Sequence, residues 1–386
     1  MKHIAYITGS RAEYGIVKRL LKKLEQDPAL KFSLVVTAMH LAPEYGKTVN
    51  VIEQDGFEIG ERIPLTLNSE NNQTIIHSMA ECLSRFGEHF QRHKYDAVIV
   101  LGDRYEMLAV ATAAAMHNIP LVHLHGGEQT LGNYDEFIRH CITKMSKLHL
   151  TSTEEYRQRV IQLGELPKNV VNTGSLGAEN SLSLVLPTKN ELVERLGIPT
   201  TPYFMVVFHP ETLTDVSVLD QIEALLQAFN SFKDNYSFVF IGSNSDTNSE
   251  QIYQRFYTYT EENQFKFFTS VKPEEYLALI KYSNGLIGNS SSGLIEAPSC
   301  GVGTINIGNR QQGRVRGESV IDVASDKASI IQGMNKLISD EFQKRLPKMT
   351  NPYFQPNAME KAYSAIKAFL ADSSNTQPKG FYDIRF

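Results

Sequence analysis

An α/β protein with two Rossmann-like domains that face a central cleft is the fold class predicted by this sequence of 386 residues. Three observations favour it. Short apolar segments that suit buried parallel strands alternate with amphipathic segments that suit helices, through both halves of the chain. The chain is longer than one hydrophobic core usually supports, because single cores stop growing at about 250–300 residues. Glycine and polar side chains follow most of the apolar segments, as they do where parallel strands end at a ligand site.

The first domain is expected to span residues 1–182 and to supply acid and base groups. The expected strands are Ile4–Thr8, Phe32–Val36, Asp96–Leu101, Leu121–Leu124, His149–Ser152 and Val170–Thr173. The expected helices run from the Gly9–Gly15 turn to Leu24, over Asn72–His93, from Asp135 onward and over Thr153–Leu163. Gly174–Ser183 is the predicted hinge to the second domain.

The second domain is expected to span residues 183–355 and to hold a nucleotide. Pro187, Pro199 and Pro202 accompany a short polar helix and mark the boundary. A last helix, near Pro356–Leu370, lies in a C-terminal segment, residues 356–386, that is expected to cross back and pack on the first domain. The expected strands are Tyr203–Phe208, Ser237–Ile241, Phe265–Phe268, Leu286–Ile287 and Val302–Ile307.

The stretch Gly288–Glu296 is the candidate phosphate site. It follows an apolar strand and precedes a segment, from Leu294, that can open a helix. The free N–H groups and the dipole at a helix start favour an anion, and the hydroxyls of Ser290, Ser291 and Ser292 can add donors beside Asn289. Glu296 is placed about one turn further on, where a carboxylate could reach a ribose. The alternative is an ordinary serine-capped helix.

Acid and base groups of the first domain gather at or just beyond strand ends. Because the carboxyl ends of parallel strands line one crevice, these groups are candidate catalytic residues. His209, at the cleft face of the second domain, is a further candidate catalytic residue. Caps and favourable charges at helix starts are the structural alternatives. The five groups of the first domain are Asp103, His125, Glu128, Asp135 and Glu136.

Basic residues and further strand-end residues are the candidate contacts for a sugar nucleotide. Arg310 and Arg314, with Arg316, place three cations in one loop, which suits a diphosphate, although a solvated basic loop is the alternative. The other candidate contacts are Arg11, His40, Arg104, Arg139, Ser270 and Val271.

Composition narrows the class of protein further. A net charge of -5 gives no global preference for nucleic acid or an anionic membrane. Three cysteines, well separated and odd in number, fit a reducing compartment, and no apolar run is long enough to span a bilayer. The N-terminus is interpreted as a strand rather than a signal peptide, so a cytoplasmic protein is expected.

A metal site is the other possibility that the sequence raises. His123 and His125, expected on one strand face, could form a metal site with Glu128, but no clear fourth ligand follows, and no metal is expected.

Taken together, seven motifs resemble those of the hydrolysing UDP-N-acetylglucosamine 2-epimerases, and most of all the bacterial enzymes of the sialic acid capsule pathway. The resemblance implies a glycosyltransferase-B-like fold and the conversion of UDP-GlcNAc and water to ManNAc and UDP, without metal or nicotinamide cofactor. It also implies a UDP-sugar as the ligand and a homodimer. The motifs are Gly9–Gly15, Leu101–Glu106, His125–Glu128, Asp135–His140, Phe208–Thr212, Gly288–Gly293 and Gly308–Arg314.

Two departures from the family pattern stand out. Many relatives carry glutamate where His125 stands here, so either His125 or Glu128 would perform that proton transfer. Non-hydrolysing relatives grip an activating second substrate partly with a His-x-Asn-Pro stretch, and the corresponding place here reads Gly242-Ser243-Asn244-Ser245. We therefore expect no allosteric requirement for substrate.

Alternative functions remain open at the level of sequence. One is the same reaction on UDP-2,4-diacetamido-2,4,6-trideoxy-glucose, a precursor of legionaminic acid. Others are a non-hydrolysing epimerase and a retaining glycosyltransferase of the same fold. A nucleotide-sugar-binding module without chemistry is a fourth, which the concentration of carboxylates at strand ends disfavours.

Overall fold

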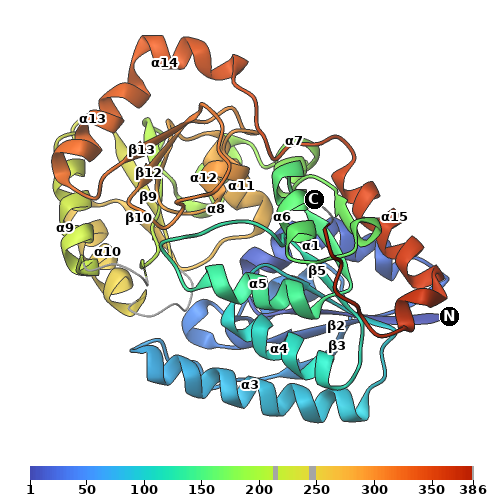
Figure 1. Cartoon of the computed structure of the whole chain (residues 1–386). Coiled ribbons are helices and arrows are strands. Elements are labelled where there is room, and N and C mark those ends of the chain that lie inside the picture. Colours follow the sequence, from blue (N-terminus) through green and yellow to red (C-terminus); the bar gives the residue numbers. More distant parts are fainter. Residues whose placement is uncertain (212–215, 243–248, 385–386) are drawn as a thin grey trace.

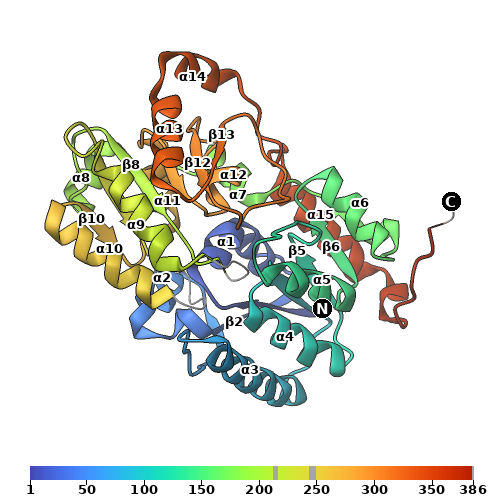
Figure 2. The same ribbon diagram turned by 60° about the vertical axis from the view of Figure 1, so that its left-hand side comes forward.

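A computed structural model describes residues 1–211, 216–242 and 249–384. Within them, two parallel sheets, each flanked by helices, form two lobes (Figures 1 and 2). A pocket lies between the carboxyl ends of their strands. The predicted α/β class with two facing Rossmann-like units is therefore confirmed. The domain limits at residues 182 and 355 stay predictions.

The first sheet has seven strands in the order β3-β2-β1-β4-β5-β6-β7. Its strands are β1 (Lys2–Thr8), β2 (Leu30–Thr37), β3 (Ile59–Ile63), β4 (Ala97–Leu101), β5 (Leu121–Leu124), β6 (Leu148–Thr151) and β7 (Val170–Asn172). Its helices are α1 (Arg11–Glu25), α2 (Val49–Gln54), α3 (Asn72–Arg92), α4 (Tyr105–Met116), α5 (Asp135–Met145), α6 (Glu154–Gln162) and α7 (Leu176–Ser183).

Both faces of this sheet are buried, which explains the unbroken apolar runs in the sequence. Successive side chains of β1 point to opposite faces, so Ile4 and Tyr6 join one core and Ala5 and Ile7 join the other. Strand β1 also pairs with β4 in a register that sets Tyr6 beside Ile99.

The second sheet has six strands in the order β10-β9-β8-β11-β12-β13. Its strands are β8 (Tyr203–Val207), β9 (Ser237–Ile241), β10 (Lys266–Phe268), β11 (Leu286–Gly288), β12 (Thr304–Ile307) and β13 (Val320–Val323). The helices of this half are α8 (Lys189–Leu196), α9 (Val218–Phe229), α10 (Ser249–Asn263), α11 (Pro273–Lys281), α12 (Ser292–Ile295), α13 (Lys327–Ile338) and α14 (Asp340–Arg345).

The last helix, α15 (Ala358–Ala371), packs on the first domain as expected; it lies beside α1 and α7 in Figure 1. Its buried residues Ala358, Ala362, Ile366 and Phe369 recur at helical spacing and join the core that contains Ile4 and Tyr6. The C-terminal segment therefore completes the core of the first domain.

The structure differs from the expected elements in four respects. The helices α2 and α4 of the first domain were not predicted. Two edge strands, β3 and β13, were not predicted, because half-exposed edge strands lack the continuous apolar run of a buried strand. The predicted hinge Gly174–Ser183 contains the helix α7. The helix expected from Leu294 is α12, which has only four residues, so its dipole adds little to anion binding.

Within the described ranges, no helix combines the length and apolar character needed to cross a bilayer.

Candidate functional site

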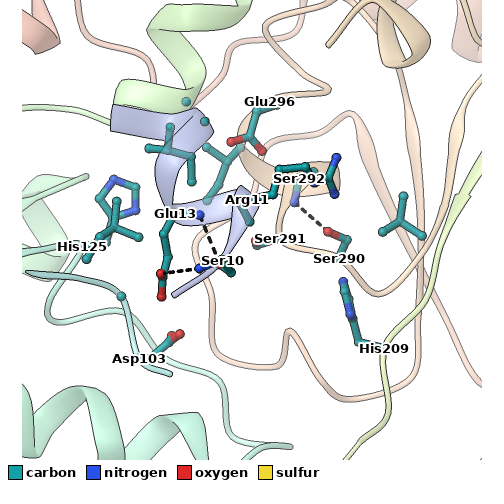
Figure 3. A pocket seen from close by; sticks show the side chains of 18 of the residues that line it. Ser10, Arg11, Glu13, Asp103, His125, His209, Ser290, Ser291, Ser292 and Glu296 are labelled. Atoms are coloured by element: carbon teal, nitrogen blue, oxygen red, sulfur yellow. Dashed lines mark hydrogen bonds between the residues drawn. The ribbon is translucent and has the colours of Figure 1, made fainter. Parts of the chain in front are cut away.

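One pocket lies between the two lobes and is lined by residues from both (Figure 3). In Figure 3, Asp103 and His125 of the first domain lie on one side, and His209 and Ser290 of the second lie on the other. The predicted site residues that line the pocket are Arg11, Asp103, Arg104, His125, Glu128, Asp135, His209, Ser290, Ser291, Ser292, Glu296, Arg310 and Arg314.

Asp103, in the turn after β4, is held ionised by arginines. The fully buried Arg139 of α5 donates from Nε to Oδ2 of Asp103 at 3.0 Å, and its Nη2 forms a second, shorter contact. Burial opposes ionisation of Asp103, but Arg139 and Arg314 outweigh it and hold the pKa of the carboxyl at about 2. At neutral pH, Asp103 can therefore accept hydrogen bonds but is a weak proton acceptor.

Glu128 connects the first domain to the second. Its Oε1 accepts a hydrogen bond from Oγ of Ser152 at 2.9 Å, and its Oε2 lies 2.5 Å from Nη2 of Arg314. The Glu128 side chain is 1% exposed, so this charge pair is largely excluded from solvent. Such buried pairs depend on both partners, because removing one leaves the other charged and unpaired.

His125 follows β5 in the left-handed region, with φ +65°. Nδ1 of its ring lies 3.7 Å from Oε1 of Glu128, and Nε2 is buried without a hydrogen-bond partner in the described structure. Burial lowers the pKa of His125, and the positive charges of Arg314 and Arg139 lower it further. The carboxylates of Glu128 and Asp103 act in the opposite direction and raise it. The ring is therefore neutral at neutral pH.

Asp135 and Glu136 begin α5 but face different surroundings. Asp135 lines the pocket, accepts a hydrogen bond from Nδ2 of Asn133 at 2.9 Å, and lies 3.7 Å from Nη2 of Arg310. Glu136 is not part of the lining; its Oε2 accepts from the backbone N–H of Thr130 and from Arg139. Glu136 therefore braces the loop and Arg139.

The serine turn lies on the second-domain side of the pocket. Gly288 has φ +141°, and a Cβ there would come 2.0 Å from the carbonyl oxygen of Val207, so only glycine fits. Ser292 accepts a hydrogen bond from Oη of Tyr276 at 2.9 Å, and the Arg11 guanidinium lies 5.1 Å from the centre of the Tyr276 ring. Hydroxyl groups and a cation thus meet at this turn, as anion binding requires.

His209 is clamped by the same turn. Its N–H donates to Oδ1 of Asn289 at 2.7 Å, and Nδ2 of Asn289 donates to the carbonyl of His209 at 2.8 Å. Burial lowers the pKa of His209 far below its ordinary value, and the nearby charges of Arg310, Arg104 and Arg11 lower it further. A neutral His209 can donate a hydrogen bond to an anion.

Glu296 packs against the first domain. A Cβ on Gly177 of α7 would come 2.2 Å from Oε1 of Glu296, so the glycine makes room for the carboxyl group. Burial raises the pKa of Glu296 to about 7. This contact joins the predicted ribose-binding residue to the predicted hinge segment.

The lining also contains Ser10, Glu13 and Tyr276, which sequence reasoning missed. Ser10 and Glu13 form a capping box at the start of α1, and Oε2 of Glu13 accepts from the N–H groups of Gly9 at 2.7 Å and Ser10 at 3.0 Å. Burial raises the pKa of Glu13 to about 7. The Ser-x-x-Glu spacing signals the cap but not its place in a pocket, and nothing in the sequence singles out Tyr276.

Six predicted residues lie outside the lining. Arg139, Asn289 and Glu136 hold lining residues or their loop in place. His40 is buried and bonded to Thr8 at 3.0 Å and Thr48 at 2.8 Å, so its contacts are internal. The remaining two residues, Ser270 and Val271, follow β10, and the carbonyl of Val271 accepts a hydrogen bond from Arg11 at 3.2 Å. Of the three loop cations, Arg316 turns away and pairs with Asp322.

The alternative of a metal site at His123, His125 and Glu128 fails on geometry. Because His125 has left-handed backbone, it does not continue the strand face of His123. The ring of His123 instead contacts the carbonyl of Gly102 at 2.7 Å and Thr143 at 3.2 Å. Among the residues described, the group with metal-ligand spacing is Glu61, His89 and His93, on β3 and at the end of α3. The Gly242–Ser245 stretch, apart from Gly242, lies outside the described residues.

Two facing parallel-sheet domains with a pocket that combines carboxylates, hydroxyls and arginines are typical of an α/β protein of the sugar-nucleotide enzyme type. Residues 22–367 match the model of the UDP-N-acetylglucosamine 2-epimerase family. The chain belongs to this family.

Two relatives and one solved structure illustrate the match. The chain is 56% identical over 384 residues to polysialic acid biosynthesis protein P7 of Escherichia coli, covering 100% of this chain and 98% of that protein. It is 37% identical to the hydrolysing GDP/UDP-N,N'-diacetylbacillosamine 2-epimerase of Campylobacter jejuni, covering 89% of each. The fold is similar to UDP-GlcNAc 2-epimerase of Neisseria meningitidis bound to UDP-GlcNAc, with a TM-score of 0.78, 18% identity, and coverage of 95% of this chain and 100% of the other.

Proposed function

We propose that this protein is a hydrolysing UDP-GlcNAc 2-epimerase, which converts UDP-GlcNAc and water to ManNAc and UDP as the first step of sialic acid synthesis. Support comes from the family, from the E. coli relative named for polysialic acid biosynthesis, and from the C. jejuni relative named as hydrolysing. The observation that carries the proposal is the pocket itself, in which Asp103, Glu128 and Asp135 face the Ser290–Ser292 turn.

The second domain would hold the leaving group. Ser290, Ser291 and Ser292 offer hydroxyl and backbone donors, and Arg310 supplies positive charge; Nε of Arg310 is buried without a hydrogen-bond partner in the described structure. Negative charge builds on the diphosphate as its bond to C1 breaks, and preorganised donors and cations stabilise that charge. A neutral His209 donates a further hydrogen bond to it.

The first domain would carry out the proton chemistry. A base removes the proton from C2 while UDP leaves from C1, which gives 2-acetamidoglucal; water then adds its hydroxyl to C1, and a proton reaches C2 from the opposite side. Ionised Asp103 would accept hydrogen bonds from the sugar or the water. Asp135 lines the same side of the pocket and would take part in the second step, the addition of water to the glucal.

Incubation with UDP-GlcNAc alone, in D2O, followed by proton NMR tests the proposal. We expect free UDP and ManNAc with deuterium at C2. UDP-ManNAc would instead indicate a non-hydrolysing epimerase, and transfer to an added sugar acceptor would indicate a glycosyltransferase. Binding of UDP-GlcNAc without any turnover would indicate a binding module.

A second substrate deserves the same assay. The C. jejuni relative at 37% identity is named for a diacetamido sugar, so UDP-2,4-diacetamido-2,4,6-trideoxy-glucose is the alternative. We expect kcat/KM to favour UDP-GlcNAc; a preference for the 6-deoxy sugar would reverse the assignment.

The proposal includes a homodimer that acts in the cytoplasm and needs no metal. Light scattering after gel filtration measures the mass directly, and a mass near 43.4 kDa would contradict a dimer. Because the reaction is expected to need no metal, turnover should persist when a chelator is added.

A further inference from the structure

Two histidines and a carboxylate meet at the edge of the first sheet, outside the pocket described above. Glu61 belongs to the edge strand β3, His89 lies in the last turn of α3, and His93 follows that helix directly. Nδ1 of His89 lies 2.6 Å from Oε2 of Glu61, and Nε2 of His93 lies 3.2 Å from the same oxygen. Helix α3 lies along the lower edge of Figures 1 and 2, with the second domain in the upper part of both views.

The periodicity of the two elements brings these side chains together. Glu61 and Ile63 are two residues apart on β3 and therefore share a face, and Ile63 packs in the core to which Phe86 of α3 contributes. His89 and His93 are four residues apart, which makes them neighbours on one side of α3. Their rings stack with centres 4.6 Å apart. Two histidines at this helical spacing and a carboxylate are a set of side chains that binds zinc in other proteins.

We propose that Glu61, His89 and His93 bind a divalent transition-metal ion such as Zn²⁺, which links the edge strand β3 to the end of α3. The ligand atoms of a tetrahedral zinc ion lie at about 2.0–2.2 Å from the metal, and hence roughly 3.3 Å from one another. The three ligand atoms here already lie within 4.8 Å of one another. Two ring nitrogens favour Zn²⁺ over Mg²⁺ and Ca²⁺, which prefer oxygen ligands. Water fills the fourth position, since the His93 side chain is half-exposed.

The far side of the His89 ring is held by a partner of the kind that orients metal-bound histidines. Its Nε2 lies 3.1 Å from Oη of Tyr95, and the two rings stack with centres 5.7 Å apart. A neutral imidazole carries one proton, so a metal on Nδ1 leaves that proton on Nε2, which donates it to Tyr95. Such outer contacts fix the ring and its tautomer. Because the His89 side chain is almost fully buried, its ring stays in this orientation.

The guanidinium of Arg92 opposes the binding of a cation here. Its Nη2 lies 3.4 Å from Oε1 of Glu61, the carboxylate oxygen that faces neither histidine. The Arg92 side chain is 61% exposed, so it can move into solvent when Oε2 binds a metal, and exposed ion pairs of this kind are weak. Arg92→Gln should therefore tighten metal binding, and a weaker affinity in this variant would contradict the proposed site.

Calorimetric titration of the untagged full-length protein with Zn²⁺ near neutral pH measures the affinity. We expect one ion per chain and no comparable binding of Mg²⁺. His93→Ala and Glu61→Gln change partly exposed side chains, so both variants should fold. Each should raise the Kd for Zn²⁺ by at least about tenfold, because even outer contacts to metal ligands are worth about 10–100-fold. The matched control is His77→Ala, an exposed histidine earlier on α3, and it should leave the Kd unchanged.

Two further readouts report the ion directly. Co²⁺ in place of Zn²⁺ should give the visible absorption of a four- or five-coordinate ion in the wild type and lose it in His93→Ala. Zn²⁺ should raise the thermal unfolding midpoint of the wild type, and a chelator should reverse the rise. Wild-type binding no tighter than that of His93→Ala, or an equal loss in His77→Ala, would overturn the assignment. No sugar nucleotide enters these measurements, so their outcome is independent of the proposed function.

Discussion

Nη2 of Arg314 lies 2.5 Å from Oε2 of Glu128, and this contact joins the two domains across the pocket. The same guanidinium donates to Oε1 of Gln311 at 2.9 Å and lies 3.9 Å from Asp103. A side chain of the second domain therefore sets the charge around two carboxylates of the first. Domain position and acid–base chemistry are coupled through this arginine.

Arg314→Gln should impair the enzyme strongly. Loss of the cation leaves Glu128 buried without its charge partner, which typically costs about 2–5 kcal/mol. We expect kcat/KM to fall by at least about 30-fold, the equivalent of ~2 kcal/mol. The matched control is Arg345→Gln, whose exposed pair with Glu318 should contribute little. Equal kinetics for the two variants would contradict a role for the Arg314 contact.

Asp103→Asn should abolish most turnover and leave UDP affinity within about threefold, because the serine turn and Arg310 that would hold UDP are in the other domain. Kinetics and calorimetric titration with UDP measure the two effects separately. Asp372→Asn, at an exposed position after α15, is the control and should change neither. Weak UDP binding with normal turnover at saturation would show that the role given to Asp103 is wrong.

Gly177→Ala should weaken UDP binding. Its Cβ would come 2.2 Å from Oε1 of Glu296, so the carboxyl group must move away from the position it has beside α7. We expect the Kd for UDP to rise by about tenfold, or ~1.4 kcal/mol. Gly87→Ala on α3 is the matched control, since a Cβ there meets nothing within 4 Å. An unchanged Kd for Gly177→Ala would mean that Glu296 does not contribute to binding.

Glu13→Gln should change how stability depends on pH. Burial raises the pKa of Glu13 from 4.5 to about 7, so the folded protein holds this proton more tightly than the unfolded chain. The stabilisation is therefore full below pH 4.5 and is lost as the pH rises toward 7. Glutamine resembles the protonated form, and the variant should gain stability relative to the wild type across this range, by up to about 3 kcal/mol.

Urea unfolding at pH 4.5 and at pH 7.5 measures this difference. Comparing variant with wild type removes the contribution of buried histidines such as His40 and His123, whose lowered pKa values, about 3, act in the opposite direction. A difference in unfolding free energy that does not vary with pH would show that Glu13 is ionised throughout.

Much of the site could be predicted because parallel strands place their carboxyl ends at one edge. Asp103, His125 and the Ser290–Ser292 turn each follow an apolar run, and the sheet order brings them to one pocket. Tyr276 could not be found in this way, because it lies in the helix α11 rather than at a strand end. The edge strands β3 and β13 escaped prediction because they lack a continuous apolar run.

The sequence by itself determined the α/β class, the two-domain organisation and the family, since these depend on hydrophobic periodicity and on the order of motifs along the chain. Only the tertiary structure decided which charges meet. It paired Arg314 with Glu128 and directed Arg139 at Asp103, and among the described residues it left Nε2 of His125 without a hydrogen-bond partner. Such contacts join residues that are distant in sequence or depend on one local backbone angle. Proton affinities in the pocket follow from those contacts and from burial, neither of which is visible in a linear pattern.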